Sequence, residues 1–337
     1  MHDRRAGTPR NNFQTVLVMI CLIAVPAAFA LHTVKVSATA AITSQNPTPY
    51  GYTVSLLLFV VPILAILFWL GPTEGIPISK KSLLKTVAFL FPLGAALDFF
   101  FAHLFLGFPN RNATLHFDVP VLRGTVPIEE YLFYFTGFMA VLLIYIWLDE
   151  YWLAAYSVPA EGGARTDFER LIRFHPQSLV TAVILVGAGL LFRHYFAPQL
   201  HGFPGYFTFL VVAALGPSTA LFPEAMPVIN WRAFSLTLFF MLLTSLLWEA
   251  TLALPYRWWC YQPEQMLGLN VTAWSGLPIE AVCVWIAVTY QTVIVYEIVR
   301  RWQSSGRAAR TAFLGSKDRK NSKTPPSSSN RMNGGQK

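Results

Sequence analysis

Two carboxylic acids lie inside long apolar stretches of this 337-residue chain, where they could carry protons. Asp98 falls within the apolar run 91–108, and Glu249 follows Trp248 in a similar run. An ionised carboxylate at the centre of a bilayer costs about 2.5 to 3.5 kcal/mol on insertion scales, so such a residue usually has a partner or a task. A low dielectric favours the protonated form, which can donate a proton. We therefore expect acid–base chemistry near these residues.

A second pair of acids opens two predicted helices. Glu129 and Glu280 each stand two residues after a proline, a residue tolerated at a helix start because its missing N–H is not needed there. The free backbone N–H groups of a first turn stabilise a negative charge. One interpretation is that both acids only start their helices. The other is that ionised and protonated acids together supply the base and the acid of one reaction.

The two pairs of acids are related by an internal duplication with an offset of 151 residues (278 − 127). The same offset carries Asp98 onto Glu249, and Tyr134 onto Trp285. We predict a first repeat over residues 1–155, with its motif at 127–130, and a second over 165–300, with its motif at 278–280. Residues 303–337 are polar and basic, which predicts a disordered tail.

The composition predicts a membrane protein. Hydrophobic residues make up 54% of the chain and charged residues 12%, against about 25% charged in soluble domains. Apolar runs have the length of about 20 residues that a helix needs to cross a bilayer. Predicted spans are 13–31, 52–70, 83–107, 127–148, 178–197, 205–222, 232–254 and 277–299. This predicts an all-α transmembrane bundle of about eight helices, with two repeats that cross the membrane in the same direction.

The charge distribution predicts the orientation. With both termini in the cytoplasm, 20 of the 25 Lys and Arg residues lie on that side, as the positive-inside rule expects. The net charge of +8 is therefore explained without nucleic acid. The first span ends in Ala28-Phe29-Ala30, which a signal peptidase could accept, and cleavage there would leave seven helices.

Neither a metal nor a redox cofactor is expected. His103, His116 and Asp118 could contribute to a metal site, but the second half has no histidine at the corresponding positions. The three cysteines show no paired spacing, and no glycine-rich nucleotide fingerprint is present.

Aromatic residues gather near the acids. Rings at a membrane interface need no further explanation. A desolvated ring face can also stabilise a positive centre by up to about 2 kcal/mol. We take four rings as candidate substrate contacts: Phe99, Tyr134, Trp248 and Trp285.

This constellation resembles the membrane-integral lycopene cyclases, a family that works either as two small subunits or as one chain with two cyclase domains. The resemblance rests on Pro127-Ile128-Glu129-Glu130-Tyr131-Leu132-Phe133, close to the family pattern P-x-E-E-x-x-F, and on the second copy Pro278-Ile279-Glu280. Asp98 and Glu249 resemble the acids of the preceding helix, and the likeness covers about 50–150 and 205–300. Ala281 departs from the pattern, because the second copy would be expected to carry another acid there.

The resemblance implies a carotenoid-biosynthesis isomerase that cyclises the acyclic end of lycopene to a β-ionone ring without redox change. An acid protonates the terminal double bond, the neighbouring double bond attacks the tertiary cation, and a base removes a proton. Glu129 and Glu130 would do the acid and base work, while Glu280, Asp98 and Glu249 would shape the site. The substrate, lycopene or a related polyene, would arrive from the lipid bilayer.

Three other functions remain open from the sequence. A related polyene or isoprenoid hydratase or transferase would need the same acids and rings. A proton-coupled transporter would also explain parallel repeats with buried carboxylates, and Pro62, Pro92 and Pro217 could interrupt its helices. A carotenoid-binding structural protein would need the rings but not the acids. The sequence leaves the ring type and the oligomeric state undetermined.

Overall fold

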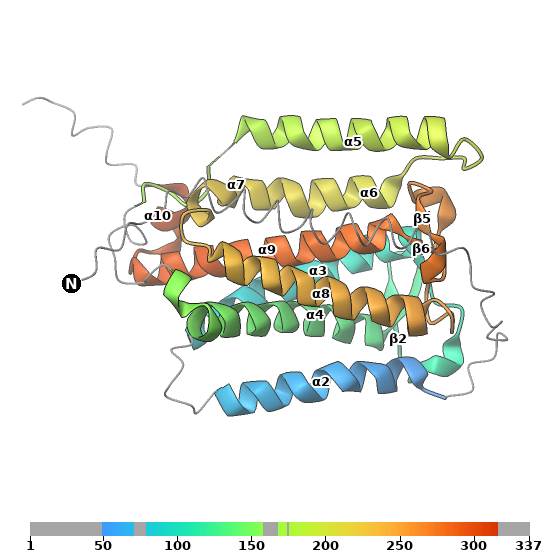
Figure 1. Ribbon diagram of the computed structural model, residues 1–337, viewed down its shortest axis with the longest axis horizontal. Helices are drawn as coiled ribbons and strands as arrows, with labels where there is room; N and C mark the ends of the chain where they lie inside the picture. Colours follow the sequence, from blue (N-terminus) through green and yellow to red (C-terminus); the bar gives the residue numbers. More distant parts are fainter. Residues whose placement is uncertain (1–48, 71–78, 158–167, 174, 316–337) are drawn as a thin grey trace, which may run out of the picture.

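The computed structural model describes residues 49–70, 79–157, 168–173 and 175–315 (Figure 1). Within these residues, seven helices are long and apolar enough to cross a membrane. They lie alongside one another in one bundle, so the protein is an all-α, multi-pass membrane protein, as its composition predicts. The predicted span 13–31 lies outside the described residues. The spans are Gly51–Phe68, Lys80–Phe105, Ile128–Trp152, Pro176–Phe196, Gly205–Ala225, Trp231–Ala253 and Ile279–Ser304.

Several spans combine an α-helix with a wider π-helical segment. The described elements of the first half are α2 (Gly51–Leu70), α3 (Lys80–Phe105), α4 (Ile128–Trp147), the π-helix η2 (Leu148–Trp152) and the 3₁₀ turn η3 (Ala154–Tyr156). Those of the second half are α5 (Pro176–Phe196), α6 (Gly205–Phe209), the π-helix η4 (Leu210–Leu215), α7 (Gly216–Ala225), α8 (Trp231–Trp248), the π-helix η5 (Glu249–Ala253), α9 (Ile279–Ser304) and α10 (Ala309–Leu314).

Prolines do not interrupt the helices of the first half. Pro62 lies inside α2 and Pro92 inside α3, and both helices continue past them. Pro217 is the second residue of α7, where the continuous span Gly205–Ala225 passes from the π-helix η4 into an α-helix, so it removes one backbone donor within that span. Neighbouring helices can accommodate such prolines inside a membrane. A proton-coupled transporter would be expected to have broken helices, and the helices are not broken at Pro62 or Pro92.

Two compact loops cover one end of the bundle, which we call the hairpin end. Strands β2 (Asp118–Val121) and β3 (Gly124–Pro127) form one hairpin, and β5 (Asn270–Val271) with β6 (Leu277–Pro278) forms the other. Strand β1 (Leu106–Gly107) pairs with β4 (Cys260–Tyr261), so the loops of the two halves are joined. Short 3₁₀ turns complete the loops: η1 (Arg111–Ala113), η6 (Pro263–Gln265) and η7 (Thr272–Trp274).

Helices α4 and α9 form the centre of the bundle. Helix α4 contacts α2, α3 and α8, and α9 contacts α3, α7 and α8 as well as α4. Helices α2 and α5 lie on opposite outer sides (Figure 1). Exposed apolar side chains such as Leu58, Phe68 and Ile184 cover these outer helices, as a lipid-facing surface requires.

Positions related by the 151-residue offset occupy matching elements. Asp98 lies in α3 and Glu249 at the end of α8, while the two prolines precede α4 and α9. Contacts match as well, because α2 packs on α4 as α7 packs on α9, and α3 packs on α9 as α8 packs on α4. The likeness therefore extends from single residues to the packing of helices.

Candidate functional site

Two acids from different halves of the chain face one pocket beneath the loops of the hairpin end. Glu130 comes from the first turn of α4, and Glu249 begins η5 at the end of α8. Both are almost fully buried. The pocket has an empty volume of about 560 Å³, its mouth included. Its lining is Leu106, Glu130, Phe133, Tyr134, Gly137, Phe138, Tyr206, Glu249, Trp259, Tyr261, Val284, Trp285 and Val288.

Glu130 is held by a tyrosine from the neighbouring helix. The hydroxyl of Tyr52, in the first turn of α2, donates to Glu130 Oε2 at 3.0 Å. Tyr52 is fully buried, and its ring stacks on Trp258 with centroids 5.7 Å apart. The packing of its ring holds the Tyr52 hydroxyl in place. The hydrogen bond from this hydroxyl then orients the carboxyl group of Glu130.

Glu249 receives two hydrogen bonds from side chains. The indole Nε1 of Trp285 donates to its Oε1 at 3.0 Å, and the hydroxyl of Tyr261 donates to its Oε2 at 2.8 Å. Tyr261 lies in β4, between the spans, and burial raises the pKa of its phenol well above the ordinary range. The phenol therefore keeps its proton and remains a hydrogen-bond donor at neutral and moderately alkaline pH.

Asp98 lies in an adjoining pocket that shares part of the same wall. Tyr134 and Tyr206 line both pockets, and Asp98 lines only the second, whose empty volume is about 770 Å³. The hydroxyl of Tyr134 lies 3.4 Å from Asp98 Oδ1. Asp98 Oδ2 is buried and has no hydrogen-bond partner within the described part of the chain. A third carboxyl group is thus available beside the first two.

No lysine, arginine or histidine lines either pocket among the residues that the structure describes. The donors to the three acids are neutral phenol and indole groups. Such donors position a carboxyl group without supplying a positive charge to pair with it. The arrangement suits groups that give and take protons rather than groups that form permanent ion pairs.

Aromatic rings form the wall between the two acids of the first pocket. Phe133 stacks on Trp248 with centroids 5.5 Å apart and meets Trp285 edge to face at 5.5 Å. Trp259 lies 5.9 Å from Phe133 and 5.1 Å from Trp248. A positive centre in this pocket would lie among aromatic side chains, which can stabilise a cation where water is excluded.

The predicted site residues fall into two groups. Glu130, Glu249, Asp98, Tyr134 and Trp285 line the pockets, and Trp248 packs behind Phe133 without lining either one.

The remaining predicted residues lie elsewhere. Glu129 Oε1 accepts the backbone N–H of Leu115 at 2.7 Å, and Glu280 Oε1 accepts that of Leu267 at 2.5 Å. These matching bonds tie each outer loop to the start of the helix that follows. Phe99 is 38% exposed on the outer side of α3 and lines neither pocket.

Four further residues complete the site and were not among the predicted site residues: Tyr52, Tyr206, Trp259 and Tyr261. Tyr52 lies 78 residues before the acid that it contacts, so no local spacing links the two. Tyr261 and Trp259 belong to an outer loop whose rings could equally have been interface residues.

The described residues contain no group of three or more His, Cys, Asp and Glu side chains placed to hold a metal ion. Comparison with known proteins adds no family to this picture: no family model matches the chain, and no curated protein or solved structure matches it significantly.

Proposed function

We propose that the protein is a membrane isomerase that cyclises the acyclic end of a long polyene, lycopene or a close relative, to a β-ionone ring. One observation carries the proposal: Glu130 and Glu249 face one aromatic-walled pocket with no basic side chain in its described lining. A redox-neutral cyclisation needs a proton donor, a base and a dry place for a cation. In this proposal the two carboxyl groups are the donor and the base, and the aromatic lining is the place for the cation.

The chemistry balances without a cofactor. A protonated carboxyl group gives its proton to the terminal double bond and leaves a tertiary carbocation. The electron pair of the neighbouring double bond then closes the ring and moves the positive charge to a ring carbon. A carboxylate removes a proton from the adjacent carbon, which forms the ring double bond. One proton is consumed and one is released, so substrate and product are isomers.

Hydrogen bonding supports separate roles for the two acids. Both oxygens of Glu249 accept hydrogen bonds, an arrangement that suits a carboxylate, so we assign it the role of base. Glu130 accepts one side-chain hydrogen bond, from Tyr52, and we assign it the role of proton donor. We assign Asp98, which lines the adjoining pocket, the role of stabilising the cation. Glu129 and Glu280 hold the loops that cover the site.

Expression in cells that accumulate lycopene tests the proposal. The pigment should shift from red to orange-yellow, and chromatography with mass spectrometry should show a product with the mass of lycopene. A product heavier by one water would assign hydration instead. Unchanged lycopene beside well-inserted protein would refute the cyclase assignment.

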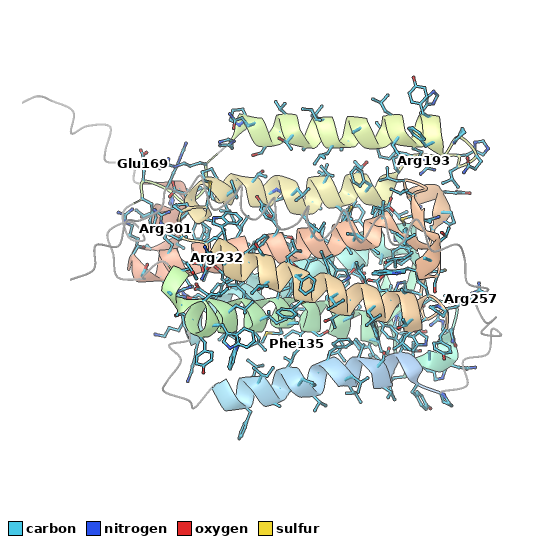
Figure 2. All side chains as sticks on the ribbon, viewed as in Figure 1. Phe135, Glu169, Arg193, Arg232, Arg257 and Arg301 are labelled. Carbon is cyan, nitrogen blue, oxygen red and sulfur yellow. The ribbon has the colours of Figure 1, made fainter. Side chains whose placement is uncertain are left out.

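We further propose that both termini lie in the cytoplasm. The hairpin end carries Arg193 and Arg257, while Arg232 and Arg301 lie toward the opposite end (Figure 2). Most of the other described basic residues, among them Lys80, also lie away from the hairpin loops. The positive-inside rule then places the hairpin end outside. A reporter that is active only in the cytoplasm, fused in turn to the N-terminus and to the C-terminus, tests this orientation.

A further inference from the structure

A groove leads away from the pocket of Glu130 and Glu249 along the side of the bundle. It is the second pocket, which lies between α3 and the α6–η4 segment, with α9 as its floor. Its lining on α3 extends from Leu90 to Phe105, a rise of about 22 Å at 1.5 Å per residue. We call it the α3–η4 groove. Its length and almost wholly apolar lining fit an extended hydrocarbon chain rather than a compact ligand.

Three small residues in the walls of the groove leave space for a ligand. Gly94 on α3 and Ala213 and Ala214 on η4 line it. Its rim borders residues that face outward, since Phe101 is 37% exposed and Val212 is 60% exposed. A molecule dissolved in the bilayer could therefore reach the groove from the side.

The matching place in the other half of the bundle is filled. Trp248, the last residue of α8, stands at the position equivalent to Leu97 (248 − 97 = 151). Its ring contacts Phe59 of α2 at 5.7 Å and Phe133 of α4 at 5.5 Å. The α3–η4 groove lies against α9. In the equivalent place against α4, aromatic rings fill the space. The duplication provides two equivalent places, but only one is open.

A polar group also points to a ligand in the groove. Asp98 lines it and is 3% exposed, and its Oδ2 has no partner within the described residues. The acid stands where the groove meets Tyr134 and Tyr206, which also line the first pocket. A chain that lies in the groove would therefore bring its end to the acids.

We propose that the α3–η4 groove is the lateral entrance from the bilayer and that it holds the unreacted length of the polyene while its end lies between Glu130 and Glu249. This inference rests on the proposed function and goes beyond it. Because the equivalent place is closed by Trp248, one chain accepts one polyene end at a time, by a path between α3 of the first half and η4 and α9 of the second half.

Blocking the groove tests the inference in the full-length protein, reconstituted in lipid nanodiscs that contain lycopene. Ala213→Trp should lower both conversion and the amount of lycopene retained by the protein at least tenfold. Leu97→Trp, which copies the residue of the closed side, should do the same. Val212→Trp is the matched control, because Val212 is the neighbouring outward-facing residue of η4, and it should stay within twofold of wild type.

A photoreactive benzophenone amino acid at position 213 or 212 gives a readout that needs no activity. A lycopene adduct is expected at 213 and not at 212. Adducts in equal amount at both positions, or cross-links from 213 to the segment 1–48, would overturn the groove as the substrate path. If Ala213→Trp fails to fold, Leu97→Trp and the cross-linking experiment still decide.

The two proposals fail in different ways. Normal conversion by wild type, Ala213→Trp and Leu97→Trp alike would overturn the groove and leave the cyclase standing. An adduct at 213 without any ring product from wild type would retain the groove and refute the cyclase. Absence of both retained lycopene and product would refute both.

Discussion

Tyr145 and Tyr296 pack edge to face with ring centroids 6.1 Å apart, although 151 residues separate them in the chain. They are equivalent positions of the duplication, so their contact marks the line about which the halves of the bundle are related. The hydroxyl of Tyr145 continues the link, because it donates to Glu297 at 3.0 Å. Tyrosines from both halves thus join in the central pair of helices, α4 and α9.

Arg300 forms ion pairs with three acids beside these rings, and its loss should destabilise the fold. It lies 3.2 Å from Asp149, 2.9 Å from Glu150 and 3.0 Å from Glu297, and its side chain is 11% exposed. Removing one partner of a buried ion pair costs about 3 to 5 kcal/mol, because the remaining charges are left buried. Arg300→Leu should therefore sharply lower the midpoint of thermal unfolding in a lipid–detergent mixture.

Arg232→Leu is the control for that experiment. The guanidinium of Arg232 is exposed and lies over the ring of Tyr156 at 3.8 Å, a contact worth about 0.5 to 1 kcal/mol at an exposed site. A midpoint that falls equally in both variants would mean that the Arg300 network does not hold the two halves together.

Neighbouring acids at the start of α4 should respond differently to the same substitution. Glu130→Gln removes the proposed proton donor and should lower lycopene conversion at least about 100-fold, the lower end of the range for a general acid. Glu129→Gln and Glu280→Gln keep an amide oxygen that can still accept the N–H of Leu115 or Leu267, so they should retain more than about a third of wild-type conversion.

Pigment extracts from cells with matched amounts of inserted protein measure that difference. Retained lycopene binding by Glu130→Gln shows that the pocket is intact. Full conversion by Glu130→Gln together with loss of conversion in Glu129→Gln would contradict the assignment. Glu129, which the sequence resemblance also implied as a catalytic acid, would then be the proton donor.

Much of the helical architecture can be predicted from the sequence, because long apolar runs in a bilayer have few alternatives to helices. The predicted span 127–148 agrees closely with α4, and 205–222 corresponds to the span Gly205–Ala225. The π-helical segment within this span was not predicted. Hydropathy does not distinguish a π turn from an α turn, since both satisfy the backbone internally.

The site could be predicted only in part. Asp98 and Glu249 stood out because an acid in an apolar run is costly, and both line the pockets. No pattern in the sequence separates Glu129 from Glu130. Adjacent residues of a helix point about 100° apart, and only the packing decides which of them faces the pocket. Tyr52 was missed because its partner lies 78 residues away.

Tyr261 should act by positioning Glu249. Tyr261→Phe removes the hydrogen bond to Oε2 and should lower conversion about three- to tenfold while lycopene binding is kept. Tyr256→Phe is the control from the same loop, because the ring of Tyr256 stacks on Trp258 with centroids 6.1 Å apart and would remain. Equal conversion by wild type and Tyr261→Phe would remove this role.

The buried phenol of Tyr261 also predicts a pH dependence. Burial raises its pKa above that of an unfolded tyrosine, about 10. Below that pH the phenol is neutral in both states, but above it only the unfolded chain releases the proton, so stability should fall as pH rises. Tyr261→Phe should therefore show a shallower fall of the unfolding midpoint above about pH 10. An unchanged slope would mean that Tyr261 is hydrated in the folded protein.

Ala281, the position equivalent to Glu130, should not accept an acid. It is fully buried in the apolar core, where its neighbours include Trp285, and a carboxyl group there would lack the partner that Tyr52 gives to Glu130. Ala281→Glu should therefore lower the yield of folded protein rather than create a second site. Ala281→Gln, similar in volume but uncharged, separates the cost of overpacking from the larger cost of a buried charge. A stable Ala281→Glu protein with doubled conversion would show that the second half keeps a usable pocket, which contradicts a single site per chain.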